Sequence, residues 1–216
     1  NVSIKEGTDN IDIAFRVDPK KLSYVRRINI RGNTKTNDEV YRRELRQYES
    51  SLYSQNKIDR SKLRLQRLKF VNEVEVKKNI VDQEKGIIDV EFNLEETQSG
   101  EFKIGAGYSD NSGAIFNINV QQDNFLGKGN NVALILEKSS YKKLIRYSNT
   151  DPYHTKDGVT KTTSLVFSET DVSSTSTASY LSDTFSYGIN YNVPISETRS
   201  YGYGGEIKFT DYTTTT

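Results

Sequence analysis

The fold of this chain is decided by the stretch GEFKIGAGYSDNSGAIFNINVQQ, residues 100–122. Apolar and polar residues alternate on both sides of a turn at 109–113. The apolar positions are Phe102, Ile104, Ala106 and Tyr108 in the first arm, and Ala114, Phe116, Ile118 and Val120 in the second. A period of two residues with one apolar face predicts a hairpin of two antiparallel strands. Each arm has about 9–10 residues, the length that a tilted strand needs to cross a bilayer.

The same alternation returns several times toward the C-terminal end. It is clear over 132–136, 185–193 and 201–209, and strands are also predicted near 144–149 and 164–168. Turns are predicted at 124–130 and 151–158, an exposed Ser/Thr-rich loop at 171–183, and a strand end at Pro194. The total is roughly seven strands. Because an odd number of strands cannot close a bacterial barrel, we expect the first, truncated part of a transmembrane β-barrel.

A soluble barrel or sandwich is the alternative. The strand lengths, the Gly and Asn residues on the polar face and the aromatic residues on the other face favour lipid over that alternative.

A different pattern precedes residue 100. A strand is predicted at Tyr24–Arg31, and Thr36 with Glu39 resembles a capping box that begins a helix reaching about Tyr48. A break at 50–56 separates it from a second helix, and strands follow at 71–76 and 88–94. The order β-α-α-β-β in roughly 75 residues predicts a small α+β domain with a modest core. An earlier strand at 11–17 ends at Asp18-Pro19, so residues 1–19 are interpreted as the end of a preceding module.

The composition excludes several classes of protein. The chain has 216 residues, 30 basic and 29 acidic, for a net charge of +1, which does not favour nucleic acid as a partner. Mean hydropathy is −0.71, and no run of 18 apolar residues predicts a membrane-spanning helix. There is no Cys and one His, His154, so Cys-based or His-based metal sites are not expected. No signal peptide is recognised at Asn1, so we expect a mature chain or an excised piece.

Catalytic and nucleotide motifs are also missing. The pair Gly105 and Gly107 precedes no helix, and the acidic residues are adjacent on strands or in turns, without the placement of a catalytic pair. We expect neither an enzyme nor a cofactor.

Several ordered stretches resemble the Omp85 family of outer-membrane proteins. They are Tyr24–Arg31 with its continuation to Thr36, then 42–47, 59–68, 121–127, and 150–153 with 157–159. The resemblance covers nearly the whole chain. It implies that residues 20–97 are the POTRA domain next to the membrane, that 1–19 end the preceding POTRA domain, and that 98–216 begin a barrel of roughly sixteen strands. The C-terminal part of the family pattern, including an Arg-bearing inward loop and the final strand, is absent here.

The resemblance further implies folding and insertion of outer-membrane β-barrel proteins in a Gram-negative outer membrane, with the POTRA domain in the periplasm. Unfolded outer-membrane proteins would be the substrates, and the last strand of each would pair at the seam formed by the first barrel strand. The residues of that strand are Gly100, Glu101, Phe102, Lys103, Ile104, Gly105, Ala106, Gly107 and Tyr108.

Physical arguments fit this implication. An open sheet edge is costly in lipid, and an added strand would satisfy it by main-chain pairing. Glycines would weaken the seam, although simple lumen packing or strand bending explains them equally well.

Accessory lipoproteins and outer-membrane lipid are the other implied partners. By position, Arg42 and Glu49 match the family's lipoprotein-docking residues; the alternative is a solvated helix face with charged neighbours. Competing functions are another Omp85-type protein translocator, of the two-partner secretion or translocation-assembly type, and a passive outer-membrane pore or adhesin.

Overall fold

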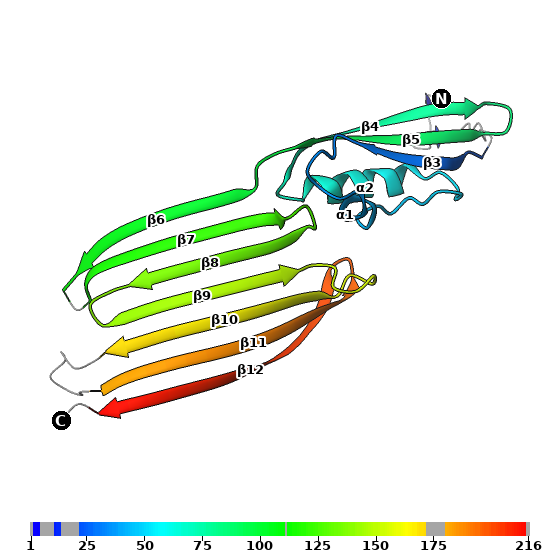
Figure 1. Cartoon of the computed structure of the whole chain (residues 1–216). Coiled ribbons are helices and arrows are strands. Elements are labelled where there is room, and N and C mark those ends of the chain that lie inside the picture. Colours follow the sequence, from blue (N-terminus) through cyan, green and yellow to red (C-terminus); the bar gives the residue numbers. More distant parts are fainter. Residues whose placement is uncertain (1, 5–10, 14–21, 111, 172–179, 215–216) are drawn as a thin grey trace.

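The computed structural model describes residues 2–4, 11–13, 22–110, 112–171 and 180–214 (Figure 1). A compact α+β domain is followed by a broad antiparallel sheet. Near the N-terminus two short strands, β1 (Val2–Ile4) and β2 (Ile11–Ile13), pair with each other. The strand predicted at 11–17 is confirmed over Ile11–Ile13, and its remainder lies outside the described residues.

The α+β domain has the predicted order β-α-α-β-β. Its strands β3 (Tyr24–Arg31), β4 (Val71–Asp82) and β5 (Ile87–Glu96) form a sheet in the order β3-β5-β4, with β3 parallel and β4 antiparallel to β5. The helices α1 (Asp38–Arg42) and α2 (Gln55–Gln66) lie against one face of this sheet (Figure 1). The buried core includes the alternate residues predicted on the last strand, Ile88, Val90, Phe92 and Leu94. Each such burial stabilises the domain by roughly 1.5–3 kcal/mol.

The first helix is much shorter than predicted, and the capping box at Thr36 is wrong. The helix begins after Asn37, without a side-chain cap, and ends at Arg42. Thr36 lies one residue before the N-cap position, and its hydroxyl accepts a hydrogen bond from Asn124 Nδ2 at 2.7 Å. The chain then turns around Gln47, whose buried side-chain amide hydrogen-bonds the segment from Tyr48 to Ser54. These bonds replace the last turns of the expected helix.

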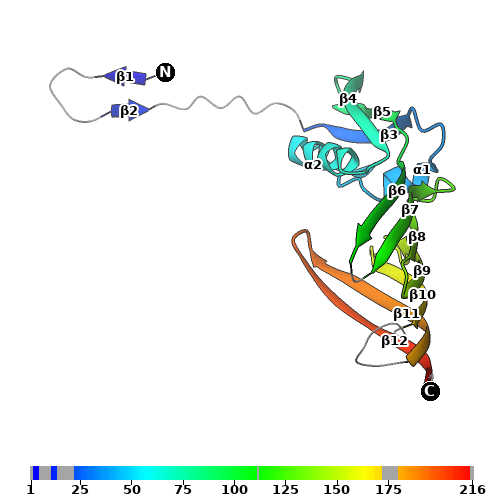
Figure 2. The same ribbon diagram turned by 90° about the vertical axis from the view of Figure 1, so that its left-hand side faces the viewer.

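The second part is a seven-stranded antiparallel sheet in which every strand pairs with its sequence neighbour, in the order β12-β11-β10-β9-β8-β7-β6. The strands are β6 (Gly100–Ser109), β7 (Gly113–Phe125), β8 (Asn130–Lys138), β9 (Lys142–Asp151), β10 (Thr160–Asp171), β11 (Tyr180–Ser196) and β12 (Arg199–Thr214). The count of roughly seven is confirmed. Figure 2 shows that the sheet is strongly twisted, so that β12 runs at an angle to β6. The sheet is not closed: within the described residues β6 and β12 each pair on one side only.

Two local predictions in this sheet are wrong. The expected loop at 171–183 is strand at both of its ends, because β10 reaches Asp171 and β11 begins at Tyr180; residues 172–179 lie outside the described part. The strand also continues past Pro194 to Ser196. A change of pairing register between Pro194 and Ser196 accommodates the proline, which cannot donate to a regular ladder.

One face of the sheet is apolar in two complete cross-strand rows. The register aligns Ile104, Ile118, Leu136, Ile145, Phe167, Phe185 and Phe209 in one row. The neighbouring row is Phe102, Val120, Leu134, Tyr147, Leu165, Tyr187 and Ile207. Many of these side chains are exposed; Ile104, for example, is 69% exposed. Such a surface suits lipid rather than water. No helix in the described ranges is long and apolar enough to span a membrane.

Candidate functional site

The candidate site is the free edge of β6, the strand predicted to pair with substrates. β6 bonds to β7 from the pair Gly100–Gln122 to the pair Ser109–Gly113. Its other edge has no strand partner among the residues that the structure describes. Unpaired main-chain N–H and C=O groups along such an edge are a template for another strand. The structure therefore brings the nine predicted residues, 100–108, together on one continuous edge.

The glycines of β6 differ in their surroundings. A side chain at Gly105 would meet the flexible amide of Asn117, whereas one at Gly107 would meet nothing within 4 Å. Close packing therefore does not require glycine at Gly107. Gly107 instead lowers the stability of the strand, because glycine has greater backbone freedom to lose.

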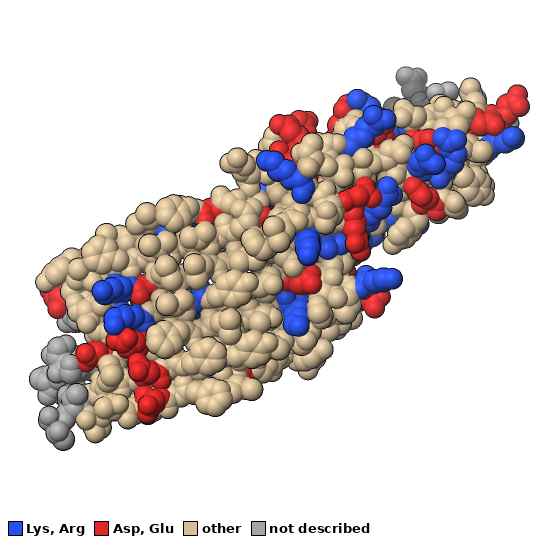
Figure 3. Space-filling model, viewed as in Figure 1, with Lys and Arg blue, Asp and Glu red and all other residues tan. Residues whose placement is uncertain are grey.

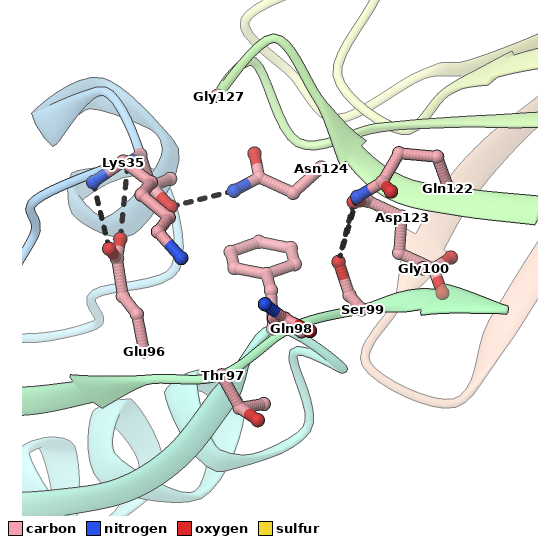
Figure 4. Close-up of a pocket in the computed structure, with 12 residues that line it drawn as sticks. Lys35, Glu96, Thr97, Gln98, Ser99, Gly100, Gln122, Asp123, Asn124 and Gly127 are labelled. Carbon is pink, nitrogen blue, oxygen red and sulfur yellow. Dashed lines mark hydrogen bonds between the residues drawn. The ribbon is translucent and has the colours of Figure 1, made fainter.

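The foot of β6 is fixed to the end of β7 by Ser99. Its hydroxyl donates to the carbonyl of Asp123 at 2.6 Å, and its own carbonyl accepts the Asp123 N–H at 3.3 Å. Beside these bonds lies a cavity of about 300 Å³ between the two parts of the chain, lined by Phe70, Gln98 and Gly100 among others (Figure 4). The residue before the first strand is thus bonded to β7, beside the cavity that separates the sheet from the α+β domain.

Glu96, the last residue of β5, holds the loop that faces this cavity. Its carboxylate accepts hydrogen bonds from the main-chain N–H groups of Thr34, Lys35 and Thr36 and from the hydroxyl of Tyr41 at 2.7 Å (Figure 4). Burial acts to raise its pKa, but the hydrogen bonds from Thr36, Tyr41, Lys35 and Thr34 together outweigh that effect. The pKa of Glu96 is lowered to about 2.

The turn between β7 and β8 rests directly on this loop. The Asn37 N–H donates to the carbonyl of Gly127 at 2.9 Å, next to the bond between Asn124 and Thr36. Gly127 has φ +71°, and a side chain there would run into the carbonyl oxygen of Lys35. Only glycine suits both the left-handed backbone and this close approach.

A second contact joins the α+β domain to the turn between β9 and β10. The guanidinium of Arg43 lies 4.4 Å from the ring centre of Tyr153, within the range of a cation–π interaction. The Tyr153 hydroxyl accepts a hydrogen bond from Arg64 at 3.2 Å and donates to the carbonyl of Arg43 at 3.4 Å. Arg64 also pairs with Glu44 at 2.7 Å.

A third contact reaches the turn between β11 and β12. Glu197 forms two ion pairs, with Arg46 and with Arg64, each at 2.8 Å. Hydrogen bonding to Arg46 is the main reason that the pKa of Glu197 is lowered. We call Arg46, Arg64, Tyr153 and Glu197 the latch. Sequence reasoning missed it, because its members are far apart in the chain and no local pattern relates them.

The structure places Arg42 and Glu49 away from the latch, at the outer edge of β3. Glu49 lies beyond the end of α1, so the two residues do not share a helix face. Both contact the main chain of Ile28: its N–H donates to Glu49 at 2.8 Å, and its carbonyl accepts from Arg42 at 3.3 Å. Arg42 also pairs with Asp38. It also lies 3.8 Å from Glu49, and both side chains are nearly half exposed, so the i,i+4 and i,i+7 charged neighbours of the alternative are present although Glu49 lies outside the helix.

Candidate metal ligands do not gather within the described ranges, where no three His, Asp or Glu side chains are placed to hold an ion. His154 lies in the turn after β9, with Nδ1 3.7 Å from Asp151.

Comparison with known proteins accounts for both parts of the chain. Residues 23–97 match the POTRA family, described as surface antigen variable number repeat, and residues 124–216 match the Omp85 superfamily domain. The chain belongs to the Omp85 superfamily: it is a POTRA domain followed by the first strands of an Omp85 barrel.

Within this superfamily the chain is similar to BamA proteins. It is 34% identical over 199 residues to the outer membrane protein assembly factor BamA of Neisseria meningitidis, covering 91% of this chain and 25% of that protein. The corresponding protein of Buchnera aphidicola is 31% identical over 66% of this chain and 23% of its own length. The chain therefore spans about a quarter of the curated relatives that it matches.

Solved structures agree. Haemophilus ducreyi BamA lacking POTRA domains 1–3 has a TM-score of 0.83 at 30% identity, covering 99% of this chain and 40% of that one. Acinetobacter baumannii CdiB, with a TM-score of 0.58 at 14% identity over 88% of this chain and 38% of its own, shares the fold alone. The sheet described above is thus part of an outer-membrane barrel of a Gram-negative bacterium, and the POTRA domain lies in the periplasm.

Proposed function

We propose that this chain is the membrane-proximal part of a protein that folds and inserts outer-membrane β-barrel proteins by strand pairing at β6. In this proposal residues 20–97 are the POTRA domain next to the membrane, 98–216 are the start of the barrel, and 1–19 end the preceding POTRA domain. The relatives are named as outer-membrane protein assembly factors, which supports the general role.

The observation that supports the mechanism is the position of β6 as the first strand of the sheet, paired with β7 on one side only, so that a barrel closing from this sheet has its seam at β6. The edge is fixed at its foot by Ser99 and unpaired above it among the described residues. An extended substrate strand can add there by main-chain hydrogen bonds, which do not depend on the substrate's side chains. Edge groups in lipid lack water to bond, so pairing them is favourable for both chains. The substrate's own folding and burial supply the free energy, and the process needs no chemical catalysis or cofactor.

Other partners follow from the same proposal. Unfolded outer-membrane proteins are the substrates, outer-membrane lipid surrounds the apolar face, and an accessory lipoprotein docks at Arg42 and Glu49. These two side chains are about half exposed, so a partner can reach their charged ends while they contact Ile28.

The test is a ladder of disulfides. This stretch contains no native Cys, so single cysteines are placed along residues 100–108 of the full-length protein, freed of other accessible cysteines. Matching cysteines are placed in the last strand of a nascent outer-membrane protein. We expect crosslinks during assembly that shift by one position on β6 for each position on the substrate.

A matched series on β8, which is paired on both sides, is the control and should give no crosslinks. Absence of crosslinks on β6 at every register, while assembly proceeds, contradicts pairing at this edge. A protein translocator or a passive pore would then be the better interpretation.

A further inference from the structure

A pair of outward-facing lysines lies at the end of the sheet farthest from the POTRA domain. Lys138 is the last residue of β8 and Lys143 is the second residue of β9, and the register places them directly opposite each other. The next pair toward the POTRA domain on the same face is Leu136 with Ile145, inside the apolar band. Figure 3 shows charged side chains gathered at this end of the sheet, beside a wide surface with little charge.

Only one of the two lysines forms an ion pair with an acidic group of the protein. Lys143 pairs with Glu169 at 2.7 Å, whereas Lys138 has no ion pair within the part of the chain that the structure describes. Like charges directly opposite each other destabilise a sheet. The neighbouring Lys142 provides a contrast: it points to the other face and pairs with Glu137 at 3.3 Å. The outward pair therefore retains an excess positive charge, and the inward lysine does not.

The backbone that carries the lysines is held in place by its neighbours. The Ser139 N–H bonds the carbonyl of Lys142 at 2.7 Å, which closes the turn. The Ser140 N–H bonds the carbonyl of Ser112, and the Asp171 N–H bonds the carbonyl of Tyr141 at 2.7 Å, so the turn is tied to both adjacent hairpins. The protein backbone therefore loses little conformational freedom when both lysines bind one ligand.

The depth of the two lysines in the membrane determines which lipid groups they can contact. The POTRA domain lies in the periplasm, so this end of the sheet faces the outer leaflet. A lysine on the lipid face costs roughly 2–4 kcal/mol at the bilayer midplane but about 0–1 kcal/mol near the interface. Two lysines that follow directly after the apolar band are therefore at headgroup depth, where their long side chains reach the polar layer. The anionic group available at that depth is the lipid phosphate.

We propose that Lys138 and Lys143 form a binding site for the phosphate of an anionic lipid in the outer leaflet. The rest of the same row restricts the lipid to this position, because Glu169, Asp183 and Asp211 continue it across β10, β11 and β12 with negative charge. An anionic headgroup is attracted by β8 and β9 and repelled farther along the row. The lipid is held two strands away from β6.

The test counts bound lipids on the full-length protein. The protein is placed in bilayer discs that contain phosphatidylcholine with a minor fraction of phosphatidylglycerol, and the lipids that remain bound are counted by native mass spectrometry. We expect enrichment of phosphatidylglycerol in the wild type and a several-fold loss of that enrichment in the double variant K138Q/K143Q. The variant K138R/K143R should keep the enrichment.

The control K142Q removes one positive charge from the adjacent residue on the opposite face and should bind as the wild type does. Equal loss in K142Q, or unchanged enrichment in K138Q/K143Q, overturns the proposal. Competition with inorganic phosphate separates the sources of the anion: displacement of the lipid by equimolar phosphate would show that the site holds phosphate ion and not a membrane lipid. Heat-modifiable migration of each variant confirms that the barrel has folded.

Discussion

The side chains of Arg42 and Glu49 meet at one residue of β3, where Glu49 accepts the N–H of Ile28 at 2.8 Å and Arg42 donates to its carbonyl at 3.3 Å. The two side chains take the place of a neighbouring strand, because they satisfy both main-chain groups that Ile28 presents at the sheet edge. They also hold the segment after α1 against the sheet. A partner that binds these charges therefore binds next to a covered β edge.

The first prediction concerns this cover. Glu49→Ala should leave the N–H of Ile28 without its acceptor and destabilise the POTRA domain by about 1–3 kcal/mol, the cost of an unsatisfied buried donor. Hydrogen exchange of the Ile28 amide measures it directly and should speed up. Glu49→Gln keeps an acceptor and should exchange nearly as slowly as the wild type. Unchanged exchange in Glu49→Ala would contradict the role of Glu49 in covering this sheet edge.

The second prediction concerns pH and Glu96. Its folded pKa, about 2, lies below its ordinary value of 4.5, so its carboxylate stabilises the fold above about pH 4.5. That stabilisation is lost as pH falls from 4.5 through 2. After discounting for solvent screening we expect a loss on the order of 1–2 kcal/mol. Urea unfolding of the POTRA domain in the full-length protein, followed across this range, measures it. Glu96→Gln should be less stable at pH 7 and should lack this pH dependence.

The third prediction concerns the latch. Glu197→Lys should repel Arg46 and Arg64 and release the turn between β11 and β12 from the POTRA domain. Spin labels at exposed Lys57 of α2 and Thr198 of the β11–β12 turn should then report a broader distance distribution. Because the pKa of Glu197 is lowered, its carboxylate stays charged somewhat below its ordinary pKa, and acidification through the folded pKa should break the ion pairs and broaden the wild-type distribution as well.

The control for the latch is Glu75→Lys, which reverses a charge paired with Lys77 inside the POTRA domain. The control should leave the spin-label distances unchanged. A narrow distribution in Glu197→Lys would mean that the other two contacts suffice to hold the domain.

The fourth prediction concerns Gly127. Gly127→Ala should weaken the contact between the β7–β8 turn and the POTRA loop by about 1–3 kcal/mol, because alanine tolerates neither the positive φ nor the approach to Lys35. Protection of the Asn37 amide, which bonds Gly127, should fall in hydrogen exchange. Gly205→Ala is the matched control, since a side chain there meets nothing within 4 Å and should leave that protection unchanged.

Local periodicity predicted most of the fold. The alternation around Ile104 and Ile118 predicted a hairpin, and the alternation of Ile88 to Leu94 predicted a half-buried strand; the structure has both. Two errors in the POTRA domain arose where side-chain hydrogen bonds decide the local structure. The helix begins after Asn37 while the hydroxyl of Thr36 bonds Asn124, 88 residues away, and the segment near Gln47 turns because that buried side chain bonds the loop after it.

The candidate site was predictable only in part. The strand at 100–108 follows from alternation, and its assignment as a pairing edge came from resemblance and remains a prediction. The latch could not be predicted, since Arg46 and Glu197 are separated by 151 residues and either charge alone resembles an ordinary surface residue. The same holds for the pair of Lys138 and Lys143, whose excess charge is visible only once the register is known.

The docking of three successive turns on one domain has a consequence for the order of folding. The POTRA domain precedes the sheet in the chain and has a buried core of its own, so it can fold before the sheet does. The strands of each later hairpin are close together in the sequence, so their contacts form quickly. A folded POTRA domain then binds the turn of each new hairpin in succession, first at Gly127, then at Tyr153 and last at Glu197. In this order of folding, the POTRA domain fixes the spacing of the first barrel strands before any later strand pairs with them.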